Sequence, residues 1–278
     1  MKIPENAKKA VLEIAEIYNS KRVPRSAAEF AYFLTLSIFP LLICVTAMLG
    51  TLNLTEEMLL DFVSEILPAN IARFIAEYMT YVSENYSHSM LFMGIIAMAT
   101  SSAAAFRSVM NIMVDIQGES RFKGFLSTIF SFIFSIVFLF AFYISALIIV
   151  TGGWFINKVQ DIFGINILLN GWSWFRFVLL FVILVTVIYA LYRLSAPREA
   201  PRKPRLFGAA TASVTLVGFS MIFSSFIGLS SKYPVVYGSL ASLMILMAWL
   251  YTCGTILIMG NVLNIVRNEN KAKNIKKG

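Results

Sequence analysis

Long apolar stretches alternate with short polar segments along the chain, and six of the apolar stretches are long enough to cross a bilayer as helices. A helix rises 1.5 Å per residue, so about 20 apolar residues cover a hydrocarbon core of roughly 30 Å. The pattern therefore predicts an all-α, polytopic membrane domain over residues 27–266. Its predicted spans are residues 27–52, 89–114, 124–151, 175–194, 206–229 and 237–265.

Small and polar residues within the spans indicate where helices pack together. The last span has no charged residue, and its small and polar residues are spaced as on a helix that packs against others: Gly238, Ser242, Thr252, Gly254, Gly260, Asn261 and Asn264. In the fifth span, Gly208 and Ala212 have the four-residue spacing that lets two helices approach closely. Pro40, near the middle of the first span, predicts a helix kink because proline removes a backbone N–H.

Several polar segments lie outside or between the spans, and three of them have a distinct pattern. Residues 1–26 have an amphipathic pattern with one apolar face, formed by Val11, Ile14, Ala15 and Tyr18. This segment is predicted to be a helix at the membrane surface, although a plain solvated helix fits nearly as well. The acidic loop 53–88 is predicted to form two amphipathic helices, an extracytoplasmic helical module, and residues 267–278 form a basic tail.

The composition agrees with a membrane protein, because 58% of the residues are hydrophobic and only 14% are charged, against about 25% in soluble domains. Most of the 23 Lys and Arg residues lie in the N-terminal segment, the even-numbered loops and the tail. The positive-inside rule therefore predicts that both termini are cytoplasmic. This distribution also accounts for the net charge of +8 without a nucleic-acid partner.

The lipid bilayer is the partner that the sequence requires. The basic loop between the fourth and fifth spans could in addition bind anionic lipid head groups. The residues that would do so are Arg198, Arg202, Lys203 and Arg205. Their role as a topology signal is also a sufficient explanation for them.

A charged residue inside a span is a candidate functional residue, because it costs roughly 2.5–3.5 kcal/mol at the helix centre. Arg107, Asn111 and Asp115 are spaced at i, i+4 and i+8 on the second span and so form one polar stripe. Glu29 enters the first span at a similar depth, which makes a Glu29–Arg107 pair geometrically possible. The alternatives are a purely structural ion pair, or an Arg107 side chain that extends to the lipid head groups.

Two asparagines on the sixth span, Asn261 and Asn264, are predicted to lie at the same depth as this stripe. Together with the four residues above they define a candidate polar cavity, open to the cytoplasm, that could hold an anion or a proton. Asparagine inside a membrane also serves as an interhelical hydrogen-bonding group, so a packing role for both residues stays open.

Signatures of soluble enzymes are missing from the sequence, which has no Gly-rich phosphate loop, no GxSxG and no HExxH. A metal-dependent nuclease needs several converging carboxylates or histidines, whereas the chain has one histidine, His88, and most of its acidic residues fall in the outer loop. Cys44 and Cys253 are too few for a zinc site or a disulfide framework. We therefore predict no enzymatic activity, no catalytic residue, no cofactor and no metal.

Several segments along the chain resemble one known family. They are SAAEFAYFLTLSIFPLL in the first span, FRSVMNIMVDIQG in the second, LYRLSAP and LFGAATAS around the fourth loop, and YGSLASLMILMAWLY followed by GNVLNI in the last span. They resemble the YihY/virulence factor BrkB family, once labelled ribonuclease BN. The resemblance implies six helices, the bacterial cytoplasmic (inner) membrane and no established substrate. The family usually has an acidic residue at the position of Asn261, so any proton or cation coupling would use Glu29 or be absent.

Two functional classes fit these observations. The first is a transporter or lipid flippase-like exporter, and the alternative is a non-transporting scaffold for envelope integrity or virulence that acts through the acidic outer helices. A membrane-bound enzyme is a third class, which would require converging acidic residues. A continuous polar cavity containing Glu29 and Arg107 would favour transport, and a dry core with these groups paired would favour the scaffold.

Overall fold

A computed structural model describes residues 5–52, 69–85, 87–118, 125–163, 168–197, 202–228 and 239–275. Every regular element in these ranges is an α-helix. The helices are α1 (Glu5–Ser20), α2 (Val23–Leu52), α4 (Ala69–Glu84), α5 (His88–Gln117), α6 (Phe125–Phe163), α7 (Leu168–Ser195), α8 (Arg202–Gly228) and α10 (Ser239–Ile275).

Six of these helices, α2, α5, α6, α7, α8 and α10, are long and apolar enough to cross a membrane. The predicted all-α fold with six candidate membrane-spanning helices is therefore confirmed. Large apolar side chains on these helices face outward, with Phe92, Phe140 and Met221 all more than three-fifths exposed. Such a surface is suited to lipid and not to water.

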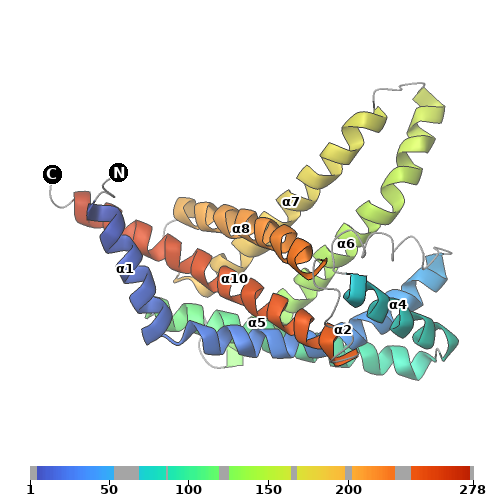
Figure 1. Ribbon diagram of the computed structural model, residues 1–278, viewed down its shortest axis with the longest axis horizontal. Coiled ribbons are helices and arrows are strands. Elements are labelled where there is room, and N and C mark those ends of the chain that lie inside the picture. Colours follow the sequence, from blue (N-terminus) through green and yellow to red (C-terminus); the bar gives the residue numbers. More distant parts are fainter. Residues whose placement is uncertain are drawn as a thin grey trace.

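The six long helices pack in the circular order α2, α5, α6, α7, α8 and α10, and α10 returns to α2. α5 also contacts α7 and α10, which are not its neighbours in this order. The two termini lie near each other at one end of the molecule, and the α6–α7 pair diverges from α2 and α4 toward the opposite end (Figure 1). We call these the terminal end and the distal end. The basic residues predict that the terminal end is cytoplasmic.

Aromatic rings fill the contact between α2, α5 and α6. The ring of Phe106 on α5 lies 6.0 Å from Phe30 of α2 and 4.8 Å from both Phe134 and Phe138 of α6, measured between centroids. These tilted and edge-on contacts are the arrangements that aromatic pairs prefer. They help to fix the position of α5 along its axis relative to α2 and α6.

Several helices extend further than the predicted spans, and α10 continues past residue 265 to Ile275, through most of the basic tail. α6 continues through Gly152 and Gly153 to Phe163, past the expected end at residue 151, and α7 begins at Leu168 instead of 175. Each glycine costs a helix only about 1 kcal/mol, which is too little to end a long apolar helix. α2 likewise runs on through Pro40, and the kink predicted there stays a prediction.

The acidic loop contributes α4, which is the second of its two predicted helices; the first lies outside the described residues. Ile75, Met79 and Val82 are buried on one face of α4, as its amphipathic pattern requires. The ring of Tyr78 packs edge-on against Phe39 of α2, with centroids 5.4 Å apart. This module is therefore docked on the distal half of α2 and α10.

The N-terminal segment folds as α1, which packs against α10 and α2. Tyr18 contacts the hydrophobic core, whereas Val11 and Leu12 remain about three-fifths exposed. Arg22, in the left-handed region at φ 53°, forms the turn into α2. Lys21 donates through Nζ to the Asp115 carbonyl oxygen at 2.8 Å, which ties this turn to the end of α5. α1 is thus a helix whose Tyr18 packs on the protein, whereas Val11 and Ala15 of the predicted apolar face are exposed, and its place at the membrane surface stays a prediction.

Candidate functional site

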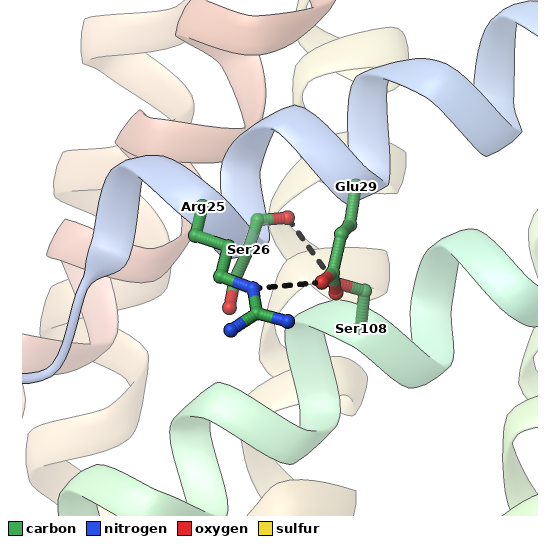
Figure 2. A network of polar contacts seen from close by, with 4 residues as sticks. All are labelled: Arg25, Ser26, Glu29 and Ser108. Atoms are coloured by element: carbon green, nitrogen blue, oxygen red, sulfur yellow. Dashed lines mark hydrogen bonds and ion pairs between the residues drawn. The ribbon is translucent and has the colours of Figure 1, made fainter.

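A polar network joins α2 and α5 near the terminal end of the bundle (Figure 2). The Ser108 hydroxyl lies 2.9 Å from Glu29 Oε2 and 3.1 Å from the Ser26 carbonyl oxygen, so its single proton can be donated to either acceptor. Glu29 Oε1 is 3.4 Å from Arg25 Nε, and the two side chains are 46% and 71% exposed. The network therefore lies on the exterior of the bundle.

The Glu29–Arg107 pair considered from the sequence does not form, because Glu29 is paired with Arg25. The geometry of α5 explains this outcome. Successive residues of a helix are about 100° apart, so when Ser108 faces α2, Arg107 points about 100° to one side and Val109 about 100° to the other. Val109 is fully buried in the core. Arg107 must therefore point toward the exterior of the bundle.

The stripe predicted on α5 occupies this exterior edge. Asn111 and Asp115 are both exposed, and Arg107 is half-buried. The Nε of Arg107 is buried without a hydrogen-bond partner in the part of the chain that the structure describes. Arg107, Asn111 and Asp115 lie about 100°, 60° and 20° from Ser108 in the same sense around the helix. They form a continuous edge that turns away from the core.

A second polar cluster lies where α7, α8 and α10 meet. Tyr192 of α7 donates its hydroxyl proton to the Leu257 carbonyl oxygen of α10 at 2.7 Å, and the Gly208 N–H of α8 donates to Asn264 Oδ1 at 2.9 Å. A methyl group on Gly260 would overlap the Tyr192 hydroxyl and lie 2.7 Å from the Ala212 Cβ. The close helix approach predicted from the small residues is thus present here.

Both asparagines of α10 are buried, with side chains only 2% exposed. The Nδ2 groups of Asn261 and Asn264 lack a hydrogen-bond partner among the described residues. A buried donor without a partner costs about 1–3 kcal/mol. Like the Nε of Arg107, both of these nitrogens are donors, so a ligand that satisfied them would have to carry acceptor atoms.

The six predicted residues therefore divide into two groups. Glu29 accepts a hydrogen bond from Ser108 and lies beside the α5 edge. Asn264 accepts one from the Gly208 N–H of α8. No hydrogen bond or ion pair in the described ranges links the two groups, and the single polar cavity proposed from the sequence stays a prediction. Equal depth along neighbouring spans does not bring two side chains together, because depth does not say which way a side chain points around its helix.

Sequence reasoning missed several residues of these clusters. Arg25 and Glu29 have the i, i+4 spacing typical of a helical ion pair, so this partner could have been found. Ser108 and Tyr192 gave no signal, because a serine or a tyrosine in an apolar run is common in membrane helices. Their roles depend on which neighbouring helix they face.

The basic loop residues are only partly described. Arg205 is buried, with 6% of its surface exposed, at the start of α8. The guanidinium of Arg267 on α10 lies 3.8 Å from the centre of the Phe207 ring, a cation–π contact between the two helices. Arg202 and Lys203 open α8, and Arg198 lies outside the described residues. Lipid binding by this loop stays a prediction.

Acidic, histidine and cysteine side chains do not gather in the described ranges, where no group of three could hold a metal ion. The sole histidine, His88, begins α5 at the distal end. Cys44 and Cys253 are both free thiols within spans.

Comparison with known proteins places these features in a family context. The family described as virulence factor BrkB matches residues 14–278. The ribonuclease-like protein YfkH of Bacillus subtilis is 24% identical over 261 residues, which are 93% of this chain and 95% of the relative. A UPF0761 membrane protein of Idiomarina loihiensis is 34% identical over 96 residues, or 34% of each chain. One of Chromobacterium violaceum is 33% identical over 81 residues, or 29% of this chain and 19% of the relative. No solved structure matches the chain.

Proposed function

This chain belongs to the virulence factor BrkB family of membrane proteins, and from that premise we propose that it is a transporter or lipid flippase-like exporter. Its substrate would carry hydrogen-bond acceptors, as an anion or an anionic head group does. The mechanism would be alternating access, in which a polar site within the bundle opens to one side of the membrane at a time.

The observation that carries this proposal is the state of Asn261. Its side chain is 2% exposed on a span, its Nδ2 has no partner, and no hydrogen bond to its side chain is present among the described residues. A purely structural asparagine inside a membrane would be expected to bridge two helices, as Asn264 does through its Oδ1. Asn261 is as buried as a packing residue, but its side chain lacks the interhelical hydrogen bond that would offset the cost of burying it.

The arrangement of the helices supports the same proposal. At the terminal end, α10 is clamped to α7 and α8 by Tyr192 and Asn264. At the distal end, the α6–α7 pair diverges from α2 and α4 (Figure 1). Alternating access requires helices that move relative to one another, and the α6–α7 pair, which departs from α2 and α4 at one end only, would be the element that moves.

One observation favours the alternative, a non-transporting scaffold. Glu29 is already paired with Arg25 and Ser108 on the exterior of the bundle. An internal proton or anion pathway would not need these groups there. The distinction therefore depends on whether Asn261 contacts a ligand.

A thermal-shift screen of the detergent-purified protein tests the proposal. The ligands are small anions and lipid head-group precursors, including inorganic phosphate and glycerol 3-phosphate. We expect at least one of them to raise the unfolding temperature of the wild type and to lose this effect in Asn261→Ala. The matched control is Asn111→Ala, which removes an exposed asparagine from another span. Arg107→Ala serves as a second control on the α5 edge.

A shift that survives Asn261→Ala but disappears in Asn111→Ala or Arg107→Ala would move the site to the exterior of α5 and contradict the proposed role of Asn261. A set of ligands that all leave the wild type unchanged would favour the scaffold.

A further inference from the structure

The exterior edge of α5 beside α2 carries Arg107, a cation within a candidate span that makes no ion pair with any described residue. The α2–α5 edge is defined here as Lys21, Arg25, Glu29, Arg107, Asn111 and Asp115. We propose that this edge binds the phosphate group of a phospholipid from the leaflet at the terminal end. The inference stands apart from the proposed transport, because a lipid can be held here whether or not anything is moved.

Arg107 is the residue that requires a partner. A guanidinium stays charged at any pH a protein meets, and a charge within a span is expensive unless it is paired or reaches the interface. In the described part of the chain, Arg107 makes no ion pair, and its Nε is buried without a hydrogen bond. Glu29 contacts Arg25 and Ser108 instead, and none of the described contacts joins it to Arg107.

The direction of Arg107 decides where a partner can come from. Its side chain leaves α5 on the side away from the buried Val109, and Asn111 and Asp115 on the same edge are exposed. An anion that reaches this edge must therefore arrive from the surrounding lipid and not from the interior of the bundle.

The depth of the edge suits a phosphate group. Ser108, the neighbour of Arg107, contacts the Ser26 carbonyl, which lies only three residues after the start of α2 at Val23. Lys21, in the turn before α2, reaches the Asp115 carbonyl. Arg107 thus lies about one helical turn, roughly 5 Å, inside the level at which α2 begins. An arginine side chain can extend that far to a lipid phosphate.

The charges along the edge favour an anion. Lys21, Arg25 and Arg107 carry positive charge, against Glu29 and Asp115. Glu29 contacts only the Nε of Arg25, whose side chain is 71% exposed. Arg107 and Asn111, one helical turn apart on the same side of α5, both carry hydrogen-bond donors, and planar guanidinium donors match phosphate geometry.

Reconstitution into nanodiscs of defined composition tests this inference. The unfolding temperature is compared between discs of pure phosphatidylcholine and discs that also contain anionic phosphatidylglycerol. We expect the anionic lipid to raise the unfolding temperature of the wild type, and this increment to be lost in Arg107→Met and reduced in Asn111→Ala. Arg73→Met removes an exposed arginine of α4 at the distal end and should leave the increment unchanged.

Two further arms separate the possible outcomes. Glycerol 3-phosphate added to phosphatidylcholine discs should not reproduce the increment in unfolding temperature, because the edge faces lipid. If this soluble compound did reproduce the increment, a phospholipid would be overturned as the ligand. An increment equal in the wild type and in both Arg107→Met and Asn111→Ala would overturn the site. Asn261→Ala should keep the increment, which distinguishes this inference from the proposed transport. If Arg107→Met does not fold, Asn111→Ala alone decides.

Discussion

The Tyr192 hydroxyl of α7 donates a 2.7 Å hydrogen bond to the Leu257 carbonyl oxygen of α10. In an α-helix that carbonyl also accepts from the N–H four residues later, which belongs to Asn261. Tyr192 therefore holds the turn of α10 that presents Asn261, and Gly260 in the same turn leaves room for the hydroxyl. The buried Asn261 side chain, whose Nδ2 has no partner among the described residues, is thus carried by a turn that Tyr192 holds.

Removal of the Tyr192 hydroxyl tests this clamp. Tyr192→Phe leaves the ring in place and deletes one fully buried hydrogen bond, which is worth about 0.5–1.5 kcal/mol. We expect a lower unfolding temperature in detergent, measured by scanning fluorimetry. Tyr32→Phe is the matched control, because Tyr32 is 52% exposed on α2. Equal stability of the two variants would contradict the clamp.

Glycine substitutions on α8 should differ sharply with position. A methyl group on Gly208 would overlap the side chain of Asn264, whereas one on Gly218 would meet no atom within 4 Å. Gly208→Ala should therefore cost about 1–3 kcal/mol through overpacking. Gly218→Ala should be neutral or gain up to about 1 kcal/mol, because alanine favours a helix over glycine. Thermal unfolding of the two variants checks the order, and the reverse order would rule out the close α8–α10 contact.

The two asparagines of α10 should respond differently to truncation. Asn264→Ala removes the acceptor that the Gly208 N–H finds on α10, whereas Asn261→Ala breaks no hydrogen bond among the described residues. We expect Asn264→Ala to lose about 1 kcal/mol more than Asn261→Ala. Denaturation of both variants under identical conditions provides the comparison. A larger loss for Asn261→Ala would identify Asn261 as a structural bridge and remove the main support for transport.

The docking of α1 should weaken in the alkaline range. Burial, then a hydrogen bond with Tyr251 and the charge of that residue, raise the pKa of Tyr18. The folded-state pKa of Tyr18 is above its unfolded value of about 10. The contribution of Tyr18 to the stability of the docked helix is therefore complete below about pH 10 and is lost as pH rises through the folded-state pKa. Proteolysis within residues 1–26 should accelerate from about pH 10 upward in the wild type. Tyr18→Phe should lack this step, and an identical step in that variant would assign it to another group.

The fold could be read from the sequence because membrane spans depend on length and hydrophobicity, which are local properties. The ends of the helices were less predictable: α6 continues through Gly152 and Gly153 because glycine weakens a helix without ending it. The site was predicted only in part. Burial of Asn261 and Asn264 followed from their place in an apolar run, but the partner of Glu29 did not. A one-residue step from Arg107 to Ser108 turns the side chain by about 100°, and only the packing of α5 decides which of the two meets α2.

The central claim, that Asn261 belongs to a site that opens to water during transport, can be tested without knowing the substrate. In a background carrying Cys44→Ser and Cys253→Ser, Asn261→Cys is treated in membrane vesicles of both orientations with a membrane-impermeant maleimide. Ile258→Cys, at a fully buried position one turn earlier on α10, is the matched control. The account predicts that Asn261→Cys is labelled from both sides and much faster than Ile258→Cys. Labelling of Asn261→Cys as slow as that of Ile258→Cys would show a permanently dry core and contradict transport.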